Sequence, residues 1–259
     1  MNYLNYIAKT NRNNQHPNGI DGTAVLLYHF PKEMKSVLEI GCGTGFTASL
    51  ICKKYPESNY IGVDINKSMI NVAKKQKKNQ KLFNCHFITL KDFKYPFNDN
   101  QFDLVFCESV LALQNFEGLN LILEEIKRIL KPNGIFIFNE SYWKKSITDH
   151  ERKNINKEIF KRFELVQAST FFDFETVSSI LENKSLSIVK SISLNDKDEI
   201  DSSILQLKLK PNPKKIVRTI FSPFSLFSFL YFKYWNSVYK KNCYLIESYI
   251  VICENEKQV

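Results

Sequence analysis

A glycine-rich turn at the end of an apolar run constrains this chain more than any other feature. The stretch VLEIGCGTGF places Gly41, Gly43 and Gly45 at alternate positions, directly after a short β-rich segment. A turn without Cβ atoms allows a ligand to approach the backbone closely, and the helix that follows presents free N–H groups to an anionic part of that ligand. Phe46 stands where the GxGxxG pattern of dinucleotide-binding folds would have its third glycine. The sequence therefore predicts a strand–turn–helix ligand site with GxGxG spacing.

Apolar β-rich runs alternate with helical patterns through the first 140 residues. Short, fully apolar strands of this kind are typical of a parallel sheet covered by helices on both faces. Pro132 and Gly134 are expected to end the last helix of this region. The expected strands cover residues 36–40, 60–64, 85–90, 102–107 and 134–139, and the expected helices lie near 44–54, 67–78 and 117–130.

The chain divides into three predicted units. Residues 1–30 carry two short helical patterns and form an N-terminal helical lid, and residues 31–140 form the ligand-binding core. Residues 141–259 complete the sheet and add a helical cap with a basic, aromatic insertion at about 202–243. Within this last unit we expect helices at 141–163 and 174–185 and strands at 186–193 and 244–255.

Two acids flank the glycine loop. Glu39 ends the first strand, where its carboxylate can meet a ligand ammonium group directly or through water. Asp64 ends the second strand about 20 residues beyond the loop, where an acid can bind both hydroxyls of a ribose. A ligand with an amino-acid head, a ribose and a base suits this spacing. The alternative is that both are ordinary strand-end acids.

Four stretches in order carry a family resemblance: VLEIGCGTGF, YIGVDINKSMINVAKK, DFKYPFNDNQFDLVFCESVLAL and EEIKRILKPNGIFIFNES. From about residue 36 to 140 the chain resembles the class I S-adenosylmethionine-dependent methyltransferases, especially the small-molecule branch that includes the quinone-biosynthesis type. This resemblance implies an α/β fold with a doubly wound, seven-stranded, mostly parallel sheet whose last strand is antiparallel. It also implies S-adenosyl-L-methionine as the cofactor.

The resemblance assigns roles to particular residues. The backbone of Gly41, Cys42, Gly43, Thr44 and Gly45 would cradle the methionine part of the cofactor, Glu39 would hold its ammonium group, and Asp64 would bind the ribose. Ile65 and Met69 would be apolar walls, and Asp92 would meet the adenine amino group with Phe93 beside the ring. Asp92 departs from the family pattern, since relative to Pro96 it lies one residue later than is common. Cys107, Glu108 and Ser109 would face the sulfonium and the incoming substrate.

The catalytic residues stay open at this stage. Methyl transfer from a sulfonium needs the nucleophile, methyl and sulfur in line, and it needs a base only if the nucleophile must lose a proton. The sequence has no nucleophile elbow, HExxH or Walker loop, and the CESV stretch lacks the Asn/Asp-Pro-Pro-Tyr motif of amino methyltransferases that act on DNA adenine or protein glutamine. His86 is expected to be structural. Residues that could line the pocket or act as a base are His16, His29, His150, Glu140 and Tyr142.

The cysteines and the first residues of the chain indicate the cellular compartment of the protein. Six cysteines are scattered without a CxxC pair or a metal-ligand spacing, so we expect reduced thiols and no metal site. The first residues lack the basic and apolar regions of a secretory signal. Together these features predict a cytoplasmic protein.

The net charge of +9 is concentrated in one segment. Residues 202–246 contain eight Lys or Arg and no Asp or Glu, so a globally basic nucleic-acid binder is disfavoured. One interpretation of this aromatic segment is a helical insert that caps the pocket. Another is that residues 211–241 contact an anionic membrane peripherally; nucleic-acid contact is the third. Its fourteen uncharged residues between Arg218 and Lys233 are too few to span a membrane.

These observations predict an enzyme that methylates a small, hydrophobic or lipid-like molecule. The alternatives are a fold relative that transfers an aminopropyl or carboxymethyl group, a module that binds the cofactor without turnover, and a nicotinamide-dependent oxidoreductase, which Phe46 disfavours. The acceptor atom and the oligomeric state are not predicted.

Overall fold

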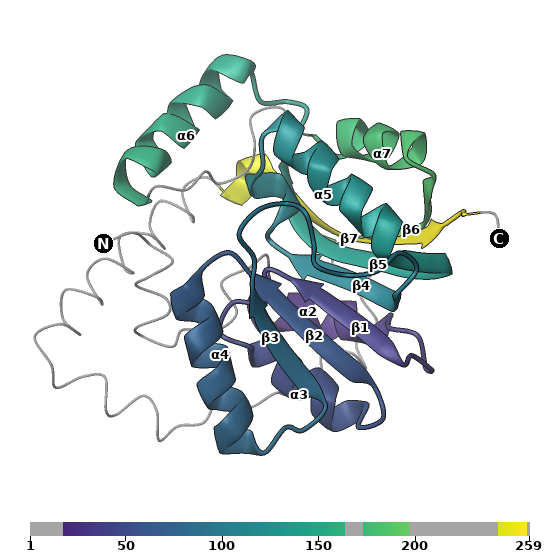
Figure 1. The fold of residues 1–259 in the computed structure, drawn as a ribbon. Helices are drawn as coiled ribbons and strands as arrows, with labels where there is room; N and C mark the ends of the chain where they lie inside the picture. Colours follow the sequence, from purple (N-terminus) through teal and green to yellow (C-terminus); the bar gives the residue numbers. More distant parts are fainter. Residues whose placement is uncertain (1–17, 164–172, 197–242, 258–259) are drawn as a thin grey trace, which may run out of the picture.

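The sheet is the organising element of the fold. The computed structural model describes residues 18–163, 173–196 and 243–257, and in these the strands follow the order β3-β2-β1-β4-β5-β7-β6. Strands β1 to β5 are parallel, and β7 runs antiparallel to both β5 and β6, as expected. The strands are β1 (Ser36–Ile40), β2 (Asn59–Asp64), β3 (Cys85–Thr89), β4 (Phe102–Glu108), β5 (Leu130–Trp143), β6 (Leu186–Ser193) and β7 (Ile246–Asn255) (Figure 1).

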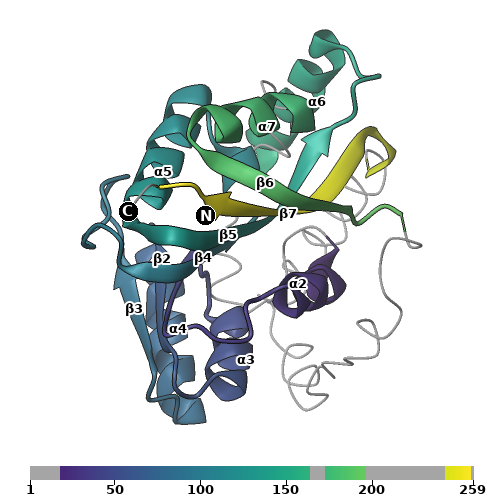
Figure 2. The same ribbon diagram turned by 90° about the vertical axis from the view of Figure 1, so that its right-hand side faces the viewer.

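Helices cover both faces of the sheet (Figure 2). One apolar cluster joins the sheet to α2 (Gly19–Tyr28), α3 (Phe46–Lys54) and α4 (Lys67–Gln80). A second cluster, on the other face, joins it to α5 (Phe116–Ile129) and α7 (Phe174–Asn183). The remaining elements are α6 (Asp149–Phe163) and the short 3-10 helices η1 (Leu111–Leu113) and η2 (Cys243–Leu245).

Side-chain caps fix where three of these helices begin. Asn66 accepts hydrogen bonds from the backbone of Ser68 and Met69 at the start of α4. Asn115 and Asp173 cap α5 and α7 in the same way. Each cap satisfies N–H groups that the first helical turn leaves without partners. The caps of α4 and α5 therefore fix the starts of the helices that follow the carboxyl ends of β2 and β4.

The predicted boundaries around β5 were wrong. The helix before it ends at Ile129, and the strand begins at once with Leu130 instead of at residue 134. Asn133 has a φ of 58°, and the pairing with β4 shifts register between Phe102 and Leu104. This irregularity lets the strand pass through Pro132. At its other end the strand continues to Trp143, because residues 141–143 pair with β7, so the expected helix over 141–163 begins only at Asp149.

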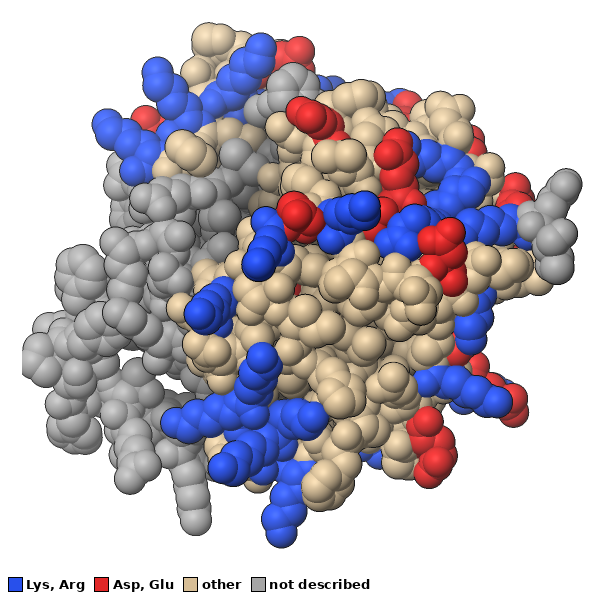
Figure 3. Space-filling model, viewed as in Figure 1, with Lys and Arg blue, Asp and Glu red and all other residues tan. Residues whose placement is uncertain are grey.

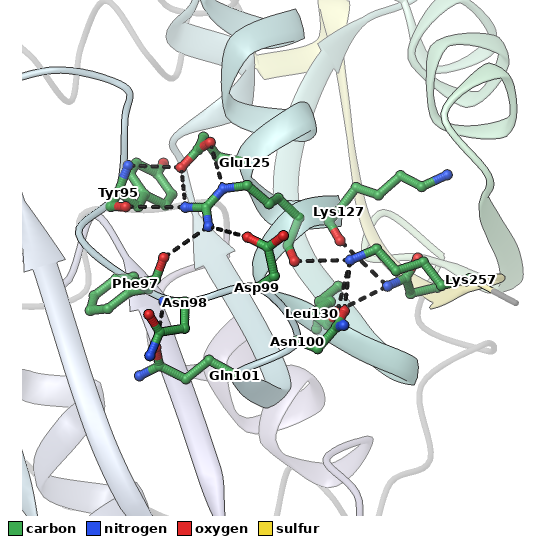
Figure 4. Close-up of polar contacts among 12 residues, drawn as sticks. Tyr95, Phe97, Asn98, Asp99, Asn100, Gln101, Glu125, Lys127, Leu130 and Lys257 are labelled. Carbon is green, nitrogen blue, oxygen red and sulfur yellow. Dashed lines mark hydrogen bonds and ion pairs between the residues drawn. The ribbon is translucent and has the colours of Figure 1, made fainter. Parts of the chain in front are cut away.

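A polar cluster fixes the connection between β3 and β4 (Figure 4). Arg128 of α5 forms ion pairs with Glu125 and Asp99, both at 2.7 Å, and donates to the carbonyl oxygens of Tyr95 and Phe97. Lys257, beyond β7, donates to the carbonyl oxygen of Arg128 at 2.9 Å. Three segments distant in sequence are thereby tied together below the candidate site.

Lysines gather on the exposed side of α4 (Figure 3). From residue 67 to 94 the chain has eight lysines and one acid, Asp92. Those on the solvent-facing side of the helix and just after it are Lys67, Lys74, Lys75, Lys78 and Lys81. The residues outside 202–246 carry almost no net charge in total, but they include this second local concentration of positive charge.

Some predictions lie outside the described residues. These are His16, the first helical pattern of the lid, and the insertion apart from its last residue, Cys243. Among the residues that the structure does describe, no helix is long and apolar enough to cross a membrane.

Candidate active site

The glycine loop turns back on β2 at the carboxyl ends of the central strands. The N–H groups of Gly41 and Cys42 both donate to the carbonyl oxygen of Val63, at 2.8 and 2.9 Å. Gly41 has a φ of 73°, and a Cβ there would lie 2.5 Å from Cγ2 of Val110. The positive φ and the close approach of Val110 both require glycine at this position.

Gly43 and Gly45 serve the loop differently. A Cβ on Gly45 would lie 3.0 Å from both Ala73 of α4 and Phe87 of β3, so this glycine permits close packing of α3. A Cβ on Gly43 would meet nothing within 4 Å. Gly43 therefore forms the open side of the loop, where a ligand can approach the backbone.

Asp64 joins the loop to the end of β2. Its Oδ2 accepts the N–H of Gly43 at 2.9 Å, and its Oδ1 accepts the N–H of Asn66 at 2.7 Å. Burial raises the pKa of Asp64, and these two hydrogen bonds oppose the rise. The neighbouring Ile65 is 70% exposed. An apolar side chain and a held carboxylate thus flank the open side of the loop.

Glu39 lies beneath the loop with only 4% of its surface exposed. The hydroxyl of Tyr60, from β2, donates a hydrogen bond to its Oε2. Burial raises the pKa of Glu39 to about 8; the Tyr60 hydrogen bond lowers it, and the nearby carboxylates of Glu108 and Asp64 raise it. A cationic group entering this space would favour the ionised carboxylate.

Glu108 connects the end of β4 to α2. The hydroxyl of Thr23 lies 3.2 Å from both carboxylate oxygens, and the amide nitrogen of Asn139 donates to Oε2 at 3.1 Å. The middle of α2 is therefore bound to the same edge of the sheet as the glycine loop. Neither Thr23 nor Asn139 was predicted as a site residue, since nothing in the local sequence indicates these contacts.

Glu140 holds the turn that follows β4. It is 1% exposed and accepts the N–H groups of Val110 at 2.6 Å, Leu111 at 2.8 Å and Ala112 at 3.3 Å. Burial raises its pKa to about 7, and these hydrogen bonds oppose the rise. The turn carries Ser109 at a φ of 57°. Glu140 thus positions the segment whose Val110 packs on Gly41.

The other predicted cofactor contacts differ in exposure. Cys42, Thr44, Met69 and Cys107 are buried, whereas Phe93 is 37% exposed. Phe93 lies near the start of α5, 3.4 Å from where a Cβ of Gly118 would be. Asp92 is exposed and accepts the N–H of Lys94 at 2.9 Å. The N–H of Leu90, directly after β3, donates to the carbonyl oxygen of Asp64 at 2.9 Å. This hydrogen bond brings the chain that follows β3 alongside the end of β2.

The three histidines in the described part of the chain lie on separate elements. His29, after α2, is half-buried, and burial and the charge of Lys190 on β6 lower its pKa. His150 is exposed in the first turn of α6, and His86 is exposed on β3 at the edge of the sheet. Tyr142 is 1% exposed, and its hydroxyl has no hydrogen-bond partner among the described residues. Nor do the described His, Cys, Asp and Glu side chains include a group of three or more that could hold a metal ion.

A family model for the methyltransferase domain matches residues 31–199, more than half of the chain. The chain belongs to this family. The match covers the glycine loop, the ends of β1, β2, β4 and β5, and β6. The resemblance inferred from the sequence is therefore confirmed at the level of family and fold.

Individual relatives agree with this assignment. A malonyl-[acyl-carrier protein] O-methyltransferase of Priestia megaterium is 31% identical over 104 residues, which is 40% of this chain and 36% of that protein. A fatty-acid O-methyltransferase of Mycolicibacterium smegmatis is 28% identical over 134 residues, 50% of this chain and 47% of the relative. The matches thus span less than half the length of these curated relatives.

Solved structures agree on the fold. A phosphoethanolamine N-methyltransferase of Haemonchus contortus, solved with phosphomonomethylethanolamine and S-adenosylhomocysteine, has a TM-score of 0.69 at 17% identity. The similarity covers 98% of this chain and 57% of that one. At this identity the similarity shows the fold alone.

Proposed function

We propose that the protein transfers a methyl group from S-adenosyl-L-methionine to a small, hydrophobic or lipid-like molecule. The observation that carries this proposal is the open side of Gly43, whose N–H donates to the carboxylate of Asp64 at the end of the strand next to the one that carries Glu39. A cofactor with a charged amino-acid head and a ribose suits this arrangement of an open backbone and two acids. Membership of the methyltransferase family supports the same cofactor.

The protein's own groups suit a cationic cofactor. Glu39 would hold the ammonium group, Asp64 would bind the ribose hydroxyls, and Ile65 and Phe93 would cover the base. When bound, the cofactor supplies a methyl group that is already activated by a sulfonium. Glu140, Glu108 and Glu39 each raise the pKa of the Cys107 thiol near the end of β4. Ionised carboxylates at this edge of the sheet would stabilise a positive sulfonium.

An aromatic wall beside β5 supports an apolar acceptor. The ring of Phe174 stacks on Tyr249 at 4.4 Å and lies 6.0 Å from the ring of Tyr142. Glu140 and Tyr142 follow the centre of β5 toward its carboxyl end, where open α/β sheets bind ligands. We assign these two residues to the lining of the acceptor pocket. The fatty-acid O-methyltransferase among the relatives has an acceptor of similar character by name.

Labelled cofactor tests the proposal directly. The purified protein is incubated with methyl-labelled S-adenosylmethionine and a metabolite extract divided into aqueous and organic-soluble fractions. We expect label in an organic-soluble product that gains the mass of one methylene. A product that gains the mass of an aminopropyl or carboxymethyl group would replace methyl transfer with those alternatives. Cofactor binding without any product would favour a module that binds without turnover.

Peripheral membrane contact through residues 211–241 is a second part of the proposal, and these residues lie outside those that the structure describes. Sedimentation with anionic liposomes at low and physiological salt should capture the intact protein but not a version lacking 211–241. If both versions stay in the supernatant, the membrane contact is wrong. If both sediment, the lysines of α4 are the other basic surface to test, with Lys74→Glu and Lys78→Glu together.

A further inference from the structure

Tyr60 contributes a polar group to an apolar environment. It is the second residue of β2, it is fully buried, and its ring lies 6.1 Å from Phe87 in an edge-on arrangement. Its side chain belongs to the apolar cluster on the α2, α3 and α4 face of the sheet. Phenylalanine would fill the same space, so packing alone does not account for the hydroxyl. The hydroxyl has a partner in Glu39 of the adjacent strand.

Strand register brings the two side chains together. Glu39 pairs with Gly62, and Tyr60 lies two residues before Gly62 on the same face of β2. Since Gly62 has no side chain, the Tyr60 ring can reach along the strand toward the Glu39 carboxylate. A Cβ at Gly62 would lie 2.9 Å from both the Cβ and the Sγ of Cys42, so this face has little spare room. The pair is therefore held by the sheet and by tight packing.

The two oxygens of the Glu39 carboxylate differ in their hydrogen bonds. Oε2 accepts the Tyr60 hydroxyl from within the core, whereas Oε1 accepts no hydrogen bond from the described residues. A buried carboxylate is costly unless its oxygens are satisfied. One end is thus fixed by the protein, and the other is left for a ligand that enters beside the loop.

We propose that Tyr60 is a positioning residue for the cofactor, whose hydroxyl orients the Glu39 carboxylate so that its free oxygen receives the cofactor ammonium group. This inference rests on the proposed role of Glu39 in holding that group. It adds a residue from the interior of β2 to a site otherwise built from strand ends and loops.

The charge environment makes this hydrogen bond consequential. Glu108 and Asp64 raise the pKa of Glu39, and Tyr60 lowers it. The charge of Glu39 also raises the pKa of the Cys42, Cys52 and Cys107 thiols. Removing the Tyr60 hydroxyl leaves burial and the two carboxylates unopposed, so Glu39 should ionise only at higher pH. An ammonium ligand would then have to displace a proton that Glu39 holds more tightly than in the unchanged protein.

Tyr60→Phe tests the inference, because it removes the hydroxyl and keeps the ring. Affinity is measured by calorimetry from pH 6.5 to 8.5 for S-adenosylhomocysteine and for 5′-methylthioadenosine, which lacks the amino-acid head. We expect the first ligand to bind about ten-fold or more weakly at pH 7, as for a lost hydrogen bond to a charged group. Its affinity should recover as the pH rises, and 5′-methylthioadenosine should bind unchanged.

Two comparisons separate the possible failures. Tyr55→Phe makes the same change at a half-buried tyrosine packed on the same apolar cluster and should alter neither ligand. Equal weakening of both ligands by Tyr60→Phe would mean a general structural effect, and no weakening would mean no positioning role; either overturns the inference. Glu39→Gln tests the underlying function: if it leaves S-adenosylhomocysteine binding intact, the role of Glu39 itself is wrong.

Discussion

At the scale of single residues, the glycines of the loop differ in what they require. Gly41→Ala would place a methyl group against Val110 in a backbone with a φ of 73°, whereas Gly43→Ala would meet only backbone strain at a φ of 51°. We expect Gly43→Ala to cost about 1–2 kcal/mol of unfolding free energy from the left-handed backbone, and Gly41→Ala to cost about 1–3 kcal/mol more from overpacking. Urea unfolding of both variants measures the difference. Equal losses would show that Val110 moves aside freely.

Asp64 permits a second residue-scale prediction. Asp64→Ala should weaken S-adenosylhomocysteine binding by about 1–3 kcal/mol through loss of hydrogen bonds to a charged group. Calorimetry measures the affinity, and thermal unfolding establishes that the fold persists without the contacts to Gly43 and Asn66. Unchanged affinity with an intact fold would remove Asp64 from the cofactor site.

The sequence could predict some of these residues and not others. Glu39, Gly41, Gly43 and Asp64 stand at the ends of apolar runs, so local pattern places them at one edge of a parallel sheet. Tyr60 occupies an ordinary strand position, and its contact depends on the register between two strands. Sequence pattern alone does not determine which side chain on one strand reaches its neighbour.

At the scale of whole elements, α2 is joined to the site by Thr23. Thr23→Val preserves the shape of the side chain and removes the hydroxyl that contacts both oxygens of Glu108. We expect a loss of about 1–2 kcal/mol in unfolding free energy, because a buried acceptor loses a donor. Urea unfolding measures this loss. Thr89→Val, at the end of β3, is the control, since its half-buried hydroxyl makes no side-chain hydrogen bond with the described residues; an equal loss there would contradict the Thr23 assignment.

The boundaries of helices and strands show where prediction from the local sequence pattern was wrong. Capping residues such as Asn66 and Asn115 mark the starts of α4 and α5 in the sequence itself. The start of β5 is different, because Pro132 and Gly134 ordinarily stop a helix and begin a loop. Pairing with Phe102 of β4 incorporates them into a strand through the irregularity at Asn133. Tertiary pairing overrode the local propensity.

At the scale of the whole molecule, alternation of strands and helices predicts a parallel sheet but not the order of its strands. The family resemblance implied a mostly parallel sheet with an antiparallel last strand, which the structure confirms, whereas the insertion of β7 between β5 and β6 was not predicted. Contacts between segments far apart in sequence, such as Arg128 with Asp99 and Lys257 with the end of α5, become apparent only in three dimensions. The position of the acids at one edge likewise depends on that strand order.

This arrangement makes stability depend on pH in a direction opposite to that of ordinary surface acids. The pKa of Glu39 is about 8 in the folded protein and 4.5 in its unperturbed state. The folded state therefore binds more protons between these values, and the unfolding free energy should fall as the pH rises toward 8. We expect a loss of about 1–2 kcal/mol between pH 6.5 and 8.5. Urea unfolding of the ligand-free protein measures it, and Glu39→Gln should remove most of the slope. Stability that rises over this range would show that Glu39 is already ionised in the ligand-free fold.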